Sequence, residues 1–94
     1  MILLTPELED TLRSNSKANK NGDKSFPFVV KLFNPYGSGT WYLSELDDND
    51  IAFGRCDLGH GAELGYISLQ ELKDYRSPLG LGIERDLYWD GEVQ

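Results

Sequence analysis

The chain has 94 residues, of which 39% are hydrophobic and 12% aromatic, and its formal net charge at pH 7 is −7. These values exclude a disordered chain and predict one domain over residues 1–94, because two domains of half this length would lack separate apolar cores. Cys56 is the only cysteine, which excludes an internal disulfide and a cysteine-based zinc site, and no apolar run reaches the roughly 20 residues of a membrane span, so we expect a cytoplasmic protein.

The charge is unevenly distributed along the chain. Residues 1–31 have a net charge of +1, whereas residues 32–94 hold twelve acids and four bases, a net charge of −8. A surface with this excess of carboxylates repels phosphate backbones. We therefore expect no direct nucleic-acid binding by the folded body.

The first predicted element is a short helix over residues 6–14. Thr5 can cap the free N–H groups, and Pro6 suits the first helical position. Glu9 and Arg13 are spaced to pair on the outer face. One apolar stripe packs this helix onto the rest of the chain, and it consists of Leu4, Leu8 and Leu12.

The next segment, residues 14–25, has no large apolar side chain and predicts a flexible polar loop. Four strands are then predicted from runs of β-branched, aromatic and alternating residues: residues 28–33, 40–46, 51–56 and 63–67. Turn-forming residues separate the first three, so they form an antiparallel meander. The near-continuous apolarity of residues 28–33 indicates a central position in the sheet.

A second helix is predicted near residues 68–76. Ser68 and Glu71 have the spacing of a capping box, and Leu69 and Leu72 share one face with Tyr75 or Arg76. The segment after it, residues 83–89, forms either a final strand or an extended stretch packed on the body. The predicted fold class is α+β, with an antiparallel sheet of about four strands and both helices covering its apolar face.

Four short stretches carry a resemblance to a known family: residues 3–8, Thr-Trp-Tyr at 40–42, residues 63–72, and residues 78–86. Together they resemble the bacterial family called domain of unknown function 2958. The resemblance covers nearly the whole chain and implies a short acidic protein found on plasmids and conjugative elements, sometimes near anti-restriction genes. It implies no catalytic or binding residues. The chain departs from the family pattern at Gly82, where proline is expected, and in its polar insert at 14–25.

The strongest polar concentration is Glu84, Arg85 and Asp86. On a strand, the two acids share one face and Arg85 points to the other, where a buried guanidinium needs a carboxylate such as Asp57 or Glu63. Two interpretations follow. The three side chains form a structural ion-pair network, which we favour, or Arg85 anchors an anionic ligand or partner.

A second group of polar residues is a weaker candidate for a functional site. Asp57, His60 and Glu63 lie three residues apart and would hold a divalent ion only if the glycine-containing loop folded back. Metal sites usually show pairs of histidines or cysteines, so we expect no metal and no cofactor. His60 could act as a general acid or base, but no nucleophile accompanies it, so we interpret it as an exposed loop residue. Asp47 begins an acidic stretch at 47–50 that lacks the spacing of a calcium loop and predicts a turn.

Aromatic residues are candidate contacts for a protein partner, because tyrosine and tryptophan are frequent interface anchors. Tyr36, at the tip of the first hairpin, is expected to be the most exposed, and Trp41 is the second candidate. A nucleic-acid stacking platform would need a positive groove, which this charge distribution does not provide. Most of five further rings are therefore expected in the core, with one or two exposed as an interaction patch: Trp41, Tyr42, Tyr66, Tyr88 and Trp89.

The leading hypothesis is a non-enzymatic accessory protein of a mobile genetic element that binds another protein through its acidic surface. A sharper version is a DNA mimic that blocks a nuclease or restriction factor with carboxylates in place of phosphates. The alternatives are a small enzyme or ligand-binding domain that uses Arg85, Glu84 and Asp86, and an oligomer-forming structural protein with an aromatic edge strand. The identity of the protein partner and the oligomeric state stay open.

Overall fold

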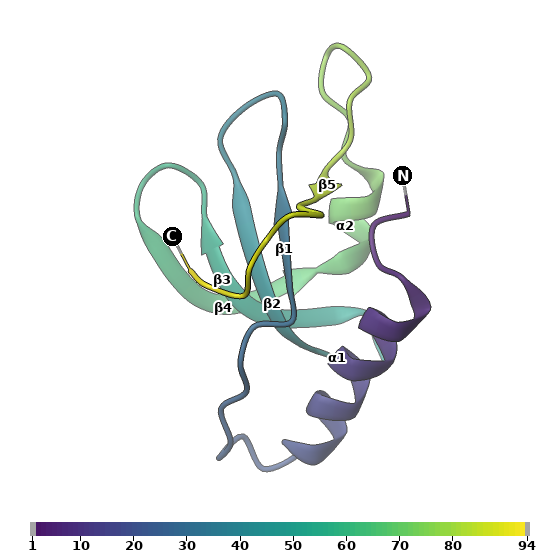
Figure 1. Ribbon diagram of the computed structural model, residues 1–94, viewed down its shortest axis with the longest axis vertical. Coiled ribbons are helices and arrows are strands. Elements are labelled where there is room, and N and C mark those ends of the chain that lie inside the picture. The colour runs from purple at the N-terminus through teal and green to yellow at the C-terminus, as the bar shows by residue number, and fades with distance from the viewer. Residues whose placement is uncertain (1, 94) are drawn as a thin grey trace.

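The computed structural model describes residues 2–93 and confirms the α+β class (Figure 1). Two helices and five strands follow in this order along the described residues: α1 (Pro6–Ala18), β1 (Val30–Phe33), β2 (Thr40–Leu46), β3 (Ile51–Asp57), β4 (Ala62–Ser68), α2 (Leu69–Asp74) and β5 (Glu84–Arg85). No helix within the described residues is both long enough and apolar enough to cross a bilayer.

The five strands form one antiparallel sheet in the order β4-β3-β2-β1-β5. The prediction of about four strands is therefore close, and β5 adds two residues that pair with Leu32 and Phe33 at the edge. The predicted meander is confirmed. The central strand is β2, whereas β1, predicted to be central, lies between β2 and the short β5.

Helix α1 is longer than predicted. The Thr5 side chain caps it as expected by accepting a hydrogen bond from the Leu8 N–H at 3.2 Å, but it continues to Ala18. The prediction that it ends near residue 14, where a loop begins, is wrong because polar side chains find partners on β2. Asn15 Nδ2 donates to the Ser44 carbonyl at 3.0 Å, and Asn19 Nδ2 to the Glu45 carboxylate at 2.8 Å.

The core lies between the helices and one face of the sheet. Leu12 of α1 is fully buried, Leu4 is buried and Leu8 packs at the margin, as the predicted leucine stripe requires. On the sheet, Gly54 of β3 allows a close approach of strands, because a side chain there would overlap the backbone carbonyl of Tyr42. The largest of the fully buried side chains are all leucines: Leu12, Leu32, Leu43, Leu46 and Leu69.

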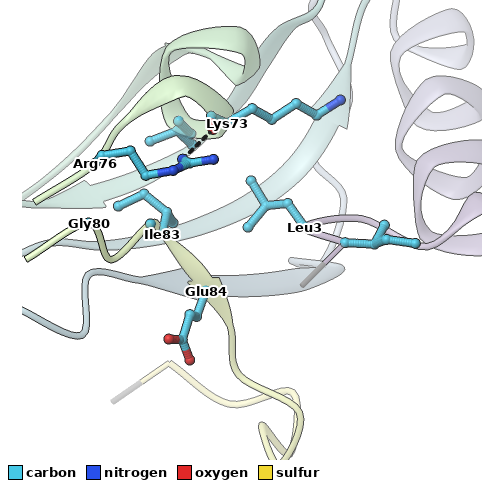
Figure 2. Close-up of a pocket in the computed structure, with 9 residues that line it drawn as sticks. Leu3, Lys73, Arg76, Gly80, Ile83 and Glu84 are labelled. Carbon is cyan, nitrogen blue, oxygen red and sulfur yellow. Dashed lines mark hydrogen bonds between the residues drawn. The ribbon is translucent and has the colours of Figure 1, made fainter.

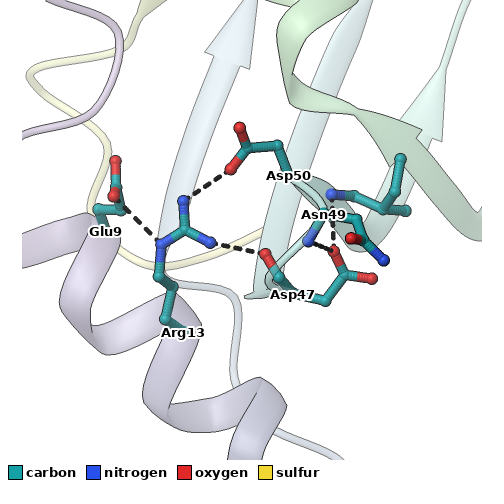
Figure 3. A network of polar contacts seen from close by, with 6 residues as sticks. Glu9, Arg13, Asp47, Asn49 and Asp50 are labelled. Carbon is teal, nitrogen blue, oxygen red and sulfur yellow. Dashed lines mark hydrogen bonds and ion pairs between the residues drawn. The ribbon is translucent and has the colours of Figure 1, made fainter.

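A polar network joins α1 to the turn between β2 and β3 (Figure 3). Arg13 Nε contacts the Glu9 carboxylate at 3.1 Å, which confirms the predicted pair, and Nη2 contacts the Asp50 carboxylate at 2.7 Å. Its Nη1 donates to the Asp47 carbonyl at 2.6 Å. Asp47 Oδ1 also accepts the Asn49 and Ile51 N–H groups. The acidic stretch is therefore a turn, as predicted.

Helix α2 begins where the sequence indicates, because the Ser68 side chain accepts the Glu71 N–H at 3.2 Å. Leu69 and Leu72 are buried against the sheet. The helix ends at Asp74, two residues before the predicted end, and Tyr75 turns into an extended conformation. Arg76 is thereby released from the helix face that Leu69 and Leu72 share.

Candidate functional site

A cleft of about 480 Å³ lies between α2, the N-terminal segment and the chain that leads into β5. Figure 2 shows the segments that form it: α2 on one side, the N-terminal residues on another, and β5 below. Apolar side chains line its interior, namely Ile2, Leu3, Leu72 and Ile83. A cavity of this size falls within the range of small-molecule sites.

Arg85 holds one wall of this cleft in place. Its Nη1 donates to the backbone carbonyls of Ile2 and Leu3, each at 2.9 Å. Because Ile2 and Leu3 precede α1, these bonds tie the start of the chain to the sheet edge 82 residues later. Arg85 therefore positions the N-terminal wall.

Two cations stand at the rim of the cleft, Lys73 and Arg76. Arg76 Nη1 donates to the carbonyls of Lys73 at 2.9 Å and Tyr75 at 2.6 Å, which fixes the plane of the guanidinium at the end of α2. Gly82 permits this placement, because an added Cβ would lie 3.1 Å from Arg76 Nη1. The ion pairs among the described residues involve Arg13 and Lys31, and neither rim cation takes part in one.

The structure separates the three residues predicted as one polar site. Glu84 lines the cleft, but Figure 2 shows its carboxylate directed away from Arg76 and Lys73. Asp86 instead pairs with Lys31 Nζ at 3.4 Å. The three side chains therefore lie in different surroundings: Glu84 at the cleft, Arg85 at the N-terminal carbonyls and Asp86 beside Lys31.

Arg85 is half-buried and does not pair with Asp57 or Glu63, the carboxylates suggested for it if it were buried. Strand order decides this, because β5 lies at the opposite edge of the sheet from β4, and β1 and β2 separate it from β3. At about 4.8 Å per strand, the distance from β5 to β3 is beyond the reach of one side chain. Among its contacts, Arg85 donates to the backbone carbonyls of Ile2 and Leu3.

The two aromatic candidates behave differently. Trp41 is only 8% exposed and belongs to the core, while one side of it lines a second cavity of about 490 Å³ together with Tyr75 and Ile83. Tyr36 is 50% exposed, but the prediction that it is the most exposed ring is wrong, since Tyr66 is 80% and Tyr88 93% exposed. Tyr66 and Tyr88 are thus the exposed rings of the five, which agrees with the expectation that one or two of them lie outside the core.

The glycine loop brings Cys56, His60 and Glu63 to a cavity of about 220 Å³. Burial raises the pKa of the Cys56 thiol, with smaller contributions from neighbouring charges, so the reactive thiolate is disfavoured. Within residues 2–93, no three histidine, cysteine or acidic side chains are arranged to hold a metal ion.

The outer half of the sheet presents a second candidate surface. Leu64 and Tyr66 alternate along β4, so their side chains point to the same face, and they are 67% and 80% exposed. The Tyr66 ring packs edge-on against Phe53 of β3, with 5.3 Å between ring centroids. We call Phe53, Leu64 and Tyr66 the β4 patch.

Sequence reasoning missed both the rim cations and the β4 patch. The available signal for the first was that Lys73 and Arg76, three residues apart, are two of only four bases in residues 32–94. For the second, the alternation of Leu64 and Tyr66 across a glycine showed a strand, but not that the strand is an edge. Strand order supplies that information.

The helix-backed antiparallel sheet, with a cation-rimmed cleft on one side and an exposed edge strand on the other, defines a small two-layer α+β protein. The chain matches the model of the family described as protein of unknown function (DUF2958) over residues 3–94, and it belongs to that family. Comparisons with curated proteins and with solved structures found no match.

Proposed function

We propose that this protein acts by binding another protein, and that the β4 patch is its contact surface. The observation that carries the proposal is the exposure of Leu64 and Tyr66 on one face of an edge strand. Large apolar side chains grouped on a surface are characteristic of interaction sites, and a tyrosine supported by a second ring is a typical interface anchor.

The charges around the patch indicate the chemistry of the partner. Asp57 lies on the patch face of β3, whereas Glu63, next to Leu64 on β4, points to the other face. Arg55 pairs with Leu64 across the two strands and places a cation on the patch face, while the chain as a whole has a net charge of −7. A partner with an apolar centre, a carboxylate opposite Arg55 and a rim of lysine and arginine would match these features. Electrostatic attraction would then accelerate association and weaken as salt rises.

The family resemblance supports a more specific role, that of an accessory protein of a mobile genetic element. Within that role, an anti-restriction function by DNA mimicry is the sharper form of the proposal, because a nucleic-acid enzyme has the basic surface that an acidic protein would occupy. Mimicry depends on carboxylates alone, whereas the β4 patch adds apolar contact. Partner binding by DNA mimicry would therefore survive loss of the β4 patch, whereas binding through the patch would not.

The test is an affinity pull-down from lysate of the native host at low and high salt, with bound proteins identified by mass spectrometry. We expect the wild-type chain to retain a partner that the double variant Leu64→Ser/Tyr66→Ala loses. The matched control is Leu87→Ser/Tyr88→Ala, which removes a leucine and a tyrosine of similar exposure from the C-terminal segment.

The outcomes separate the two forms. Retention of the partner by the β4 double variant, with release at high salt, would support carboxylate mimicry and reject the patch. Equal loss in both double variants would reject the β4 patch as the specific surface. Circular dichroism of each variant shows whether the fold is kept.

A further inference from the structure

We propose that the cleft beside α2 is a binding site for a small organic carboxylate with an apolar tail, held by Arg76 with support from Lys73. This site is separate from the β4 patch, since its lining residues lie on α2, the N-terminal segment and the chain around β5. Four features of the cleft support the assignment.

The first feature is the hydrogen bonding of the Arg76 guanidinium. Both Nη1 hydrogens have partners in the Lys73 and Tyr75 carbonyls. These bonds orient the guanidinium and leave the edge formed by Nε and Nη2 without a hydrogen-bond partner in the described part of the chain. That edge presents two parallel N–H donors, which match the two oxygens of a carboxylate.

The second feature is the local charge. The protein is strongly acidic, yet the rim of this cleft carries two cations, and the one acid that lines it, Glu84, directs its carboxylate elsewhere (Figure 2). The acid that senses Lys73 is Asp50, whose carboxylate is already bonded to Arg13. Figure 2 shows Lys73 extending away from Arg76, and its flexible stem allows its amine to move toward an incoming anion.

The third feature is the apolar interior. Leu3, Leu72 and Ile83 line the cleft, and each keeps 7–8% of its surface exposed. An alkyl or aryl group on the ligand would remove this surface from water. The combination of a guanidinium edge and an apolar floor selects amphipathic anions over simple salts.

The fourth feature is that the cleft is built by contacts from distant parts of the sequence. Arg85 fixes the N-terminal wall through the Ile2 and Leu3 carbonyls, and Ser77 fixes the opposite lip by accepting the Leu79 and Leu81 N–H groups. A site held on several sides needs little reordering when a ligand enters, which favours binding.

The experiment uses the full chain and two probes of equal length, octanoate and 1-octanol, in a titration followed by amide chemical shifts. We expect saturable octanoate binding with shifts at Leu72, Gly80, Gly82 and Ile83, and about tenfold weaker binding of octanol, the size of one charge-assisted contact. Arg76→Gln should remove this preference, and Lys73→Gln should weaken octanoate about threefold, as expected for an exposed cation. Arg55→Gln, on β3 outside the cleft, should change nothing.

Three results would overturn the proposal: no saturable octanoate shifts at the cleft, equal affinity for octanol, or unchanged preference in Arg76→Gln. If Arg76→Gln fails to fold, Arg76→Lys keeps the charge but loses the paired donors. It should lose most of the preference for octanoate, and full retention there would reject the guanidinium contact. Neither Arg76 nor Lys73 belongs to the β4 patch, so the cleft variants leave the partner-binding test independent.

Discussion

Each helix has one associated arginine, Arg13 within α1 and Arg76 just after the end of α2, and the two arginines make different contacts. Arg13 of α1 contacts a carboxylate on its own helix and two groups of the turn between β2 and β3. Arg76, after α2, bonds only to carbonyls at the end of its own helix among the contacts described. The first arginine joins two elements of the fold, whereas the second is oriented locally and faces a cavity.

Arginine thus has two roles in this acidic protein. Carboxylates lie close to Arg13 on α1, and its contacts hold the helix to the turn between β2 and β3. At the α2 end, Glu84 and Asp86 are directed elsewhere, so the rim of the cleft stays positive. The α1 end should therefore govern stability, and the α2 end should tolerate change while controlling binding.

The largest effect is expected from the leucines that anchor the two helices. Leu12→Ala should lower the free energy of unfolding by about 2–5 kcal/mol, because Leu12 is fully buried and its removal leaves a cavity. Leu72→Ala should cost less, since one side of Leu72 already faces the cleft. Urea denaturation of both variants measures the difference, and equal losses would contradict a stability asymmetry between the two ends.

A smaller effect is expected from the arginines themselves. Arg13→Gln should lower Tm by a few degrees because it removes contacts to Glu9, Asp50 and the Asp47 carbonyl at once. Arg76→Gln should change Tm less, because the carbonyls it leaves at the end of α2 can bond to water. Differential scanning calorimetry compares the two, and a larger loss for Arg76→Gln would reverse the assignment of roles.

The smallest effect is a pH dependence of the Arg13 contribution. The hydrogen bond from Arg13 lowers the pKa of Asp50 below its ordinary value of 3.8. A carboxyl with a lowered pKa in the folded state adds stability above the unfolded pKa, and loses it as pH falls through the folded value. The Tm difference between wild type and Arg13→Gln should be constant from about pH 5 to 7 and shrink below about pH 4.

Asp50→Asn provides the control for this measurement. It removes the titrating group, so Arg13→Gln in that background should produce a Tm change that varies less between pH 3 and 5. A difference that shrinks equally with and without Asp50 would assign the pH dependence to another group.

Much of the fold followed from local chemistry. Thr5 and Ser68 capped helices where predicted, the turns after residues 33 and 46 separated the strands, and Leu4, Leu8 and Leu12 packed as one stripe. These features depend on residues within a few positions of each other, where dihedral preferences and side-chain spacing decide the outcome. The end of α1 was missed because Asn15 and Asn19 are held by β2.

Composition and short-range pattern were sufficient to predict the fold class, most of the elements, the family resemblance, the acidic character and the Glu9–Arg13 pair within one helix. The other ion pairs and the exposed position of β4 depend on how the strands are ordered in the folded chain. Strand order placed Arg85 far from Asp57 and left β4 at an edge, while the end of α2 turned Arg76 toward the cleft. The physical reason is that ion pairing and burial depend on distances across the sheet, which residues far apart in the chain set together.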